Sequence, residues 1–125
     1  MRLMVLGNET IAQKMTIALA VRGIEVVSTS DSTQALAQLK EERVDLAAID
    51  ASLGEIEMVC NCIAELFDIP LVLIVDESDA DWEKLQSPDT DGYISAGASG
   101  AEMAARLQAV VRRWASHSRS SLNAW

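Results

Sequence analysis

The sequence is poor in cysteine and in aromatic residues, and each shortage narrows the class of protein. Its two cysteines, Cys60 and Cys62, form no disulfide framework, so a reducing, cytoplasmic compartment is expected. Residues two apart on a helix point in different directions, which favours thiols in or near the core over a metal site. Aromatic residues make up only 4% of a chain that is 50% hydrophobic. The predicted core therefore consists mainly of Val, Ile, Leu, Ala and Met.

Positive charge is also scarce. The formal net charge is -9 and the sequence pI is about 4.4, so neither nucleic acid nor an anionic membrane is an expected partner. No stretch approaches the length of a transmembrane span, and the first residues lack the long apolar region of a signal peptide. The 125 residues are enough for one domain with one sizeable core.

What the sequence contains is a regular alternation of short apolar strands and amphipathic helices. Alternation with short connections predicts an α/β domain with a parallel sheet covered by helices on both faces. We expect this domain to span residues 1–114 and a polar tail or linker to span 115–125. The predicted strands cover residues 3–6, 25–29, 44–50, 71–75 and 92–95, and the main predicted helices cover 9–22, 32–42, 55–67 and 100–114. A further short helix, capped by residues 78–81, is predicted to run through residue 86.

Local signals support these boundaries. Asn8 is a predicted N-cap and Gly23 a predicted stop for the first helix. Asp31 and Gln34 resemble a capping box that opens the second helix. Ser99 and Glu102 form the same pattern before the last one.

One strand carries the main functional signal. Residues 44–50 form an apolar run that ends on a carboxylate, Asp50. A run of this kind indicates a strand buried on both faces. In an open parallel sheet, ligands and chemistry lie just beyond the carboxyl ends of the strands. Asp50 therefore occupies the position expected of a reactive group.

The order and spacing of several segments resemble the receiver domain of bacterial response regulators. These segments are residues 45–50 followed by Leu53, the Ile69-Pro70 step, and residues 91–113, which are similar to the last strand and helix of the OmpR/PhoB class. The resemblance implies a flavodoxin-like, three-layer α/β/α fold with a five-stranded parallel sheet in the order 2-1-3-4-5. It also implies a role in two-component signalling, a phosphoacceptor at Asp50, and a DNA-binding domain after this one that regulates transcription.

The sequence departs from this family at most positions that aspartyl phosphorylation needs. A phosphoacceptor requires Mg²⁺, held by two carboxylates after the first strand, together with a hydroxyl after the fourth strand and a Lys after the fifth. Here Gly7 and Asn8 replace the acidic pair, Val75 replaces the hydroxyl, and Ala96 replaces the Lys. The aromatic Tyr93 is retained. A shift by one residue would make Asn8 and Glu9 the remnant of the pair.

These departures predict a pseudo-receiver that is not an enzyme, has no cofactor, and acts through contact with a protein partner or with itself. Magnesium, with Glu9 and Asp50 as its only candidate ligands, is expected only if phosphorylation survives. In the OmpR/PhoB class, acidic and basic groups form ion pairs across a two-fold dimer. The residues that match those positions are Asp91, Glu102, Arg106 and Arg113. A solvated charged face is the alternative interpretation.

Two further functions stay open at this point. Asp50 would still accept a phosphoryl group if a weak metal site remained. A dinucleotide-binding domain is the other alternative, because Gly7, Gly23 and Asp31 imitate the glycine fingerprint and its distant acidic residue. Against that alternative, Glu9 and Ala12 stand at the second and third glycine positions, and the Glu9 carboxylate would repel a pyrophosphate.

Overall fold

The computed structural model describes residues 1–76 and 90–123, and for residues 116–123 it describes the backbone alone. Five parallel strands form one sheet in the order β2-β1-β3-β4-β5. This is the predicted flavodoxin-like topology, with β3 at the centre. The strands are β1 (Arg2–Leu6), β2 (Glu25–Thr29), β3 (Leu46–Asp50), β4 (Leu71–Val75) and β5 (Gly92–Ser95), and the helices are α1 (Glu9–Ala20), α2 (Ser32–Glu41), α3 (Ile56–Leu66) and α4 (Gly100–Asn123).

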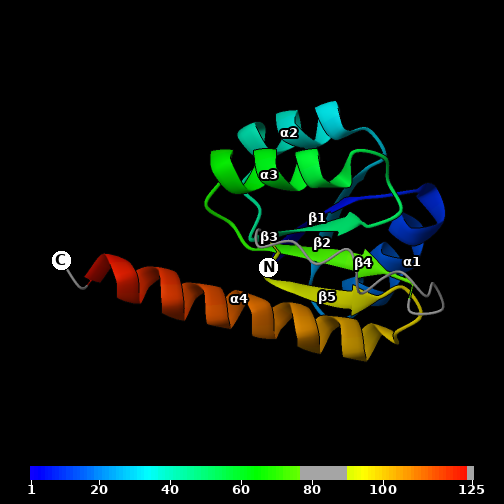
Figure 1. Cartoon of the computed structure of the whole chain (residues 1–125). Coiled ribbons are helices and arrows are strands. Elements are labelled where there is room, and N and C mark those ends of the chain that lie inside the picture. The colour runs from blue at the N-terminus through cyan, green and yellow to red at the C-terminus, as the bar shows by residue number, and fades with distance from the viewer. Residues whose placement is uncertain (77–89, 124–125) are drawn as a thin grey trace.

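The sheet separates two apolar clusters, one on each face. Helices α1 and α4 cover one face and α2 and α3 cover the other, as Figure 1 shows. Successive side chains of a strand point to opposite faces, so Leu3 and Val5 enter the first cluster while Met4 and Leu6 enter the second. Strands β3 and β4 are buried along their whole length. The continuous apolar runs of the sequence therefore have the expected cause, which is cover on both faces.

The helix caps largely follow the sequence signals. The Asn8 side chain accepts a hydrogen bond from the Ile11 amide at 2.9 Å, and Gly23 adopts a positive φ of 76° after α1. Asp31 caps α2 by accepting from the Thr33 amide at 2.9 Å. The predicted capping box is wrong in its second half, because Gln34 pairs with the hydroxyl of Thr29 at 3.1 Å. Thr29 itself accepts from the Asp31 amide at 3.2 Å, the bond expected of Gln34.

The last helix is longer than the sequence predicts. We expected it to stop near residue 114, yet α4 continues to Asn123 through residues predicted as a polar tail. Residues 101–123 contain neither Gly nor Pro, so the chain has no local stop signal there. The division into a domain and a linker stays a prediction. The predicted short helix that runs through residue 86, with its cap at residues 78–81, lies outside the described residues.

Among the helices that the structure describes, none combines the length and the apolarity needed to cross a membrane. The two thiols are placed as expected for core or near-core cysteines: Cys60 is buried and Cys62 is half-buried on α3.

Candidate functional site

Asp50 lies at the carboxyl end of the central strand, between β1 and β4. Asp50 is only 4% exposed, and it is one of the two buried polar or charged residues in the described part of the chain. The end of β1 reaches the same edge, so a Cβ placed on Gly7 would lie 3.2 Å from the Cβ of Asp50. The sheet thus brings together Asp50 and the residues that replace the acidic pair, as the sequence predicted.

Both oxygens of the Asp50 carboxylate have donors within the chain. Oδ1 accepts from the Ser52 amide at 2.9 Å and from the Ser52 hydroxyl at 2.7 Å. Oδ2 accepts from Nδ2 of Asn8 at 3.5 Å, which is a long and weak hydrogen bond. A buried carboxylate without such donors would be costly, so these groups stabilise Asp50 where it is. Ser52 is not among the residues predicted from the sequence, although Asp-x-Ser is a known pattern for a local turn that the side chains close.

The orientation of the Asn8 amide bears on whether Mg²⁺ fits this site. The Asn8 Oδ1 atom already accepts from the Ile11 amide, so its nitrogen points toward Asp50. Magnesium requires oxygen ligands, and Gly7 has no side chain to supply one. Within the described ranges, no three carboxylate, Cys or His groups gather in a way that would hold a metal ion. The residues present do not fit the family's magnesium site.

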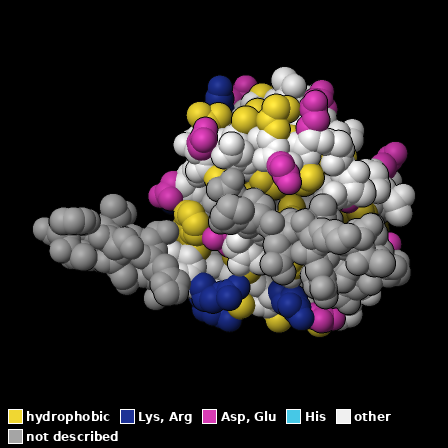
Figure 2. All heavy atoms as spheres, viewed as in Figure 1, with side chains coloured by type: hydrophobic (Ala, Val, Ile, Leu, Met, Phe, Trp, Pro, Cys, Tyr) yellow, Lys and Arg dark blue, Asp and Glu magenta, His cyan; other side chains and the backbone are white. Residues whose placement is uncertain are grey.

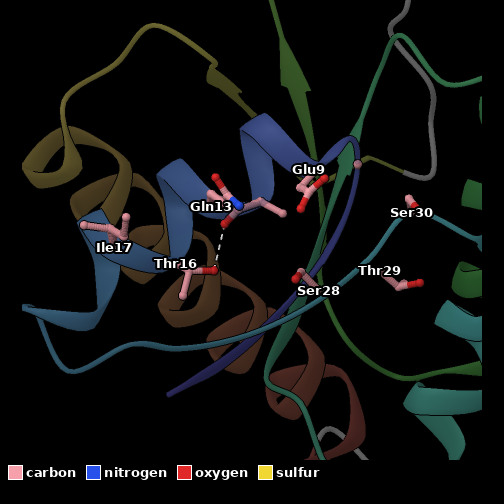
Figure 3. Close-up of a pocket in the computed structure, with 9 residues that line it drawn as sticks. Glu9, Gln13, Thr16, Ile17, Ser28, Thr29 and Ser30 are labelled. Atoms are coloured by element: carbon pink, nitrogen blue, oxygen red, sulfur yellow. Dashed lines mark hydrogen bonds between the residues drawn. The ribbon is translucent and has the colours of Figure 1, made fainter.

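Glu9, the other predicted remnant of the acidic pair, is exposed in the first turn of α1. Its side chain lines a groove between α1 and β2, together with Ser28 and Ser30 (Figure 3). Asp50 is not among the residues that line this groove. Glu9 and Asp50, predicted from the sequence as joint candidate metal ligands, thus differ in their surroundings: Glu9 is exposed in the groove and Asp50 is buried at the end of β3.

The residues predicted to match the family's switch positions are Val75 at the end of β4, Tyr93 within β5 and Ala96 just after β5. Val75 is 2% exposed, and its side chain belongs to the cluster beneath α2 and α3. Tyr93 is half-buried and packs against the same cluster. Since Val75 is wholly apolar and buried, it offers no hydroxyl to a group on Asp50. Tyr93 keeps the aromatic ring of the resembled family.

Ala96 follows β5 and packs partly against the cluster beneath α1 and α4. Its carbonyl oxygen accepts a hydrogen bond from the ammonium group of Lys14, which reaches across from α1. Lys14 is not among the residues predicted from the sequence, because no local pattern links positions so far apart in the chain. A cation is thus present beside the loop after β5, and it is used to tie this loop to α1.

The four residues of the predicted dimer face lie along β5 and α4. Asp91 accepts from the Leu71 amide at 2.8 Å, just before β5 begins. Glu102 and Arg106 approach each other within 3.7 Å one helical turn apart. Arg113 lies at the other end of the same surface, its Nη2 atom 3.9 Å from a Cβ placed on Gly92. Glu102, Arg106 and Arg113 project within about 40° of one another around the helix axis, given 3.6 residues per turn. We call this set the α4 charged stripe.

This arrangement is the fold of response-regulator receiver domains, and similar solved structures carry that description. A putative response regulator from Chloroflexus aurantiacus is 17% identical, with a TM-score of 0.77 over 89% of this chain and 97% of that one. The signal receiver domain of an HD domain-containing protein from Pseudomonas fluorescens is 20% identical, with a TM-score of 0.78 over 94% and 90%. The chemotaxis response regulator CheY4 of Vibrio cholerae is 19% identical, with a TM-score of 0.73 over 87% and 96%.

Sequence comparison also finds a similarity to response regulators. The heme response regulator HssR of Staphylococcus aureus strain Newman is 26% identical over 107 residues, which cover 83% of this chain and 48% of HssR. The chain thus matches about half the length of the curated relatives. No protein-family model matches it. The resemblance to receiver domains is confirmed, whereas the OmpR/PhoB class and the loss of phosphorylation stay predictions.

Proposed function

We propose that this chain is a receiver-type signalling module whose output does not depend on phosphorylation of Asp50. One observation carries the proposal: the Asp50 carboxylate accepts hydrogen bonds from Ser52 and Asn8. These neighbours are hydrogen-bond donors, whereas a phosphoacceptor needs a neighbouring carboxylate that binds a metal ion. The groups that would act on a phosphoryl group are replaced by residues that cannot. Gly7 provides no metal ligand, Val75 no hydroxyl and Ala96 no cation.

The number of missing groups matters more than the loss of any one. A single preorganised charge contact stabilises a transition state by roughly 3 kcal/mol, which is a hundredfold or more in rate. Losing the metal ligands, the hydroxyl and the Lys together should remove most of the stabilisation that an aspartate nucleophile needs. The fold then serves as a scaffold for protein contacts, and the chain is not an enzyme.

Incubation with a small phosphodonor and Mg²⁺, followed by intact-mass measurement, tests this proposal. We expect no phosphoryl adduct on Asp50, because neither metal nor cation would neutralise the incoming oxygens. A phosphorylatable receiver run in parallel controls for the reagent. A stoichiometric adduct that disappears in the Asp50→Asn variant would show that the chemistry survives.

A second element of the proposal is homodimerisation through the α4 charged stripe. The stripe contains both signs of charge, with Glu102 near the start of α4 and Arg113 three turns later. A two-fold axis can set such a surface against itself, so that each acid meets a base of the other subunit. In Figure 2, Lys and Arg side chains gather along the lower edge of the molecule, where α4 runs. Asp and Glu side chains are scattered over the remaining surface in that view.

Sedimentation velocity of the wild type and of Arg106→Ala tests the dimer. We expect the wild type to dimerise and the variant to dissociate at least about tenfold more readily, since one charged contact is lost in each half of the interface. Arg112→Ala is the matched control, because Arg112 is exposed on the same helix but projects away from the stripe. Monomeric behaviour of all three proteins would remove the dimer from the proposal.

The proposed module acts on an attached output domain, as the length comparison suggests. HssR extends well beyond the part that this chain matches. In the resembled class the further part is a DNA-binding domain, and regulation of transcription would lie there. The net charge of -9 makes direct contact between this domain and DNA unfavourable.

A further inference from the structure

The groove between α1 and β2 has a volume of about 420 Å³ and lies at the opposite edge of the sheet from the α4 charged stripe. Glu9, Gln13, Thr16 and Ile17 line it from α1, and Ser28 and Ser30 line it from the β2 side (Figure 3). The proposed function uses none of these side chains. Thr16 donates its hydroxyl to the Ala12 carbonyl at 2.7 Å, so it does not point its proton into the groove.

The backbone of β2 borders this groove with unpaired groups. In a parallel strand, the N–H and C=O of one residue point to the same side, and successive residues alternate. The Glu25 amide donates to the Met1 carbonyl at 2.9 Å and the Thr29 carbonyl accepts from the Gly7 amide at 3.1 Å, so both residues face β1. Val26 and Ser28 therefore present their N–H and C=O to the outer edge. In the described part of the chain, no strand pairs with this edge.

The two ends of the groove have different chemistry. Glu9 is exposed at one end and makes no ion pair with another described residue. Ile17, at the other end, leaves 73% of its surface exposed. Eight helical residues separate them, a distance of about 12 Å along α1. An extended chain rises about 3.3 Å per residue, so about four of its residues span this distance, and residues four apart lie on the same face.

We propose that this groove binds an extended segment of another protein that adds a strand to the edge of β2. Its backbone would pair with the N–H and C=O groups of Val26 and Ser28. A Lys or Arg of the segment would lie against Glu9, and an apolar side chain four residues away would cover Ile17. The site does not depend on the state of Asp50, so its test and the phosphodonor test can succeed or fail separately.

The negative charge of this chain favours a basic partner segment over a second copy of the chain. Each copy has a net charge of -9 and would bring a Glu9 to the shared edge. Like charges at that edge oppose β2–β2 pairing, whereas the same field attracts a basic segment. Glu25 is already paired with Arg2 at 3.2 Å, which leaves Glu9 as the carboxylate offered to the partner.

An array of short synthetic peptides tests the proposal, with Lys and Leu placed four residues apart in either order and the other positions varied. We expect saturable binding of a subset by fluorescence anisotropy. In that subset, replacing Lys by Glu should weaken binding at least about tenfold, which is the loss expected when an ion pair becomes a repulsion. Moving the Leu by one position should do the same, because it turns the side chain to the other face.

Two measurements on the protein locate the binding. Amide shifts in ¹H–¹⁵N spectra should be largest at Val26 and Ser28, and Glu9→Gln should weaken binding about tenfold. Glu65→Gln, which removes an exposed carboxylate on α3, should bind like the wild type. The proposal is overturned if no peptide binds, if the amide shifts lie outside β2, or if Glu9→Gln binds the peptides as tightly as the wild type. It is also overturned if the chain self-associates through this groove and Glu9→Gln strengthens that association.

Discussion

A variant that carries Asn8→Asp, Val75→Thr and Ala96→Lys together should accept a phosphoryl group on Asp50. Each substitution returns one type of group that the chemistry requires: a metal ligand, a hydroxyl and a cation. At about a hundredfold per group, their combined effect should bring an undetectable reaction into the range of an intact-mass assay. We expect an adduct from a small phosphodonor in the presence of Mg²⁺ and none without it.

The geometry around Asp50 explains why the metal ligand is introduced at Asn8 and not at Gly7. Asp is as good an N-cap as Asn, so Asn8→Asp keeps the start of α1. It also removes the donor to Asp50 and sets two carboxylates side by side, which repel each other until a cation binds. Gly7 is left unchanged, because a Cβ there would lie 3.2 Å from the Cβ of Asp50. A pair of oxygen ligands is therefore created without crowding the strand ends.

Thermal unfolding provides a second readout for the same variant. Asn8→Asp should lower the melting temperature in the absence of Mg²⁺ and regain stability when Mg²⁺ is added, since a ligand that binds only the folded state stabilises it. The wild type should not respond to Mg²⁺. The combined variant with Asp50→Asn is the control for phosphorylation at other sites. A triple variant that folds, responds to Mg²⁺ and still gives no adduct would mean that a different group is limiting.

The alternation of apolar strands and helices was sufficient to predict a parallel sheet covered on both faces, and β3 and β4 are buried along their whole length. The order of the strands was predicted from the resemblance to receiver domains, and the structure confirms it. The sequence also located Asp50 and the residues that replace the acidic pair, since the carboxyl ends of β1 and β3 meet at one edge. Lys14 could not be predicted in the same way. Its partner, the Ala96 carbonyl, is far away in the chain, and only the packing of α1 beside the loop after β5 brings them together.

The end of α4 and the groove beside β2 show two other limits. The polar composition after residue 114 suggested a tail, but a helix ends where a stop residue or lost packing ends it, and this chain has no Gly or Pro there. The groove depends on how α1 packs against the edge strand β2, and the hydrophobic periodicity of the sequence does not predict that packing. The sequence predicts Glu9 as a metal-ligand remnant, and in the structure its side chain lines this groove.

The contact between α1 and the start of α4 should be the most sensitive point of the cluster that these two helices share. A Cβ placed on Gly100 would lie 2.9 Å from the Cβ of Ala18 and 3.1 Å from the Ala18 carbonyl oxygen. Both atoms belong to the rigid part of α1, so they cannot move aside as the end of a long side chain would. Only glycine allows the two helices to approach this closely.

We therefore expect Gly100→Ala to destabilise the fold, although Ala favours a helix over Gly. Helix propensity gains at most about 1 kcal/mol, and less in the first turn, whereas overpacking of this kind costs typically 1–3 kcal/mol. The net loss in the free energy of unfolding should be about 1–2 kcal/mol, which lowers the melting temperature by roughly 4–8 °C for a chain of this size. Thermal unfolding followed by circular dichroism measures it.

Two companion variants separate steric clash from a general effect of the substitution. Gly54→Ala should be neutral or slightly stabilising, because a Cβ there meets nothing within 4 Å. Adding Ala18→Gly to Gly100→Ala removes the 2.9 Å contact but leaves the carbonyl at 3.1 Å, so it should recover part of the loss. The recovery appears as a non-additive coupling in a double-mutant cycle. A Gly100→Ala protein that melts at or above the wild-type temperature would mean that α1 and α4 are free to separate, and the α4 charged stripe would then lack a fixed position on the fold.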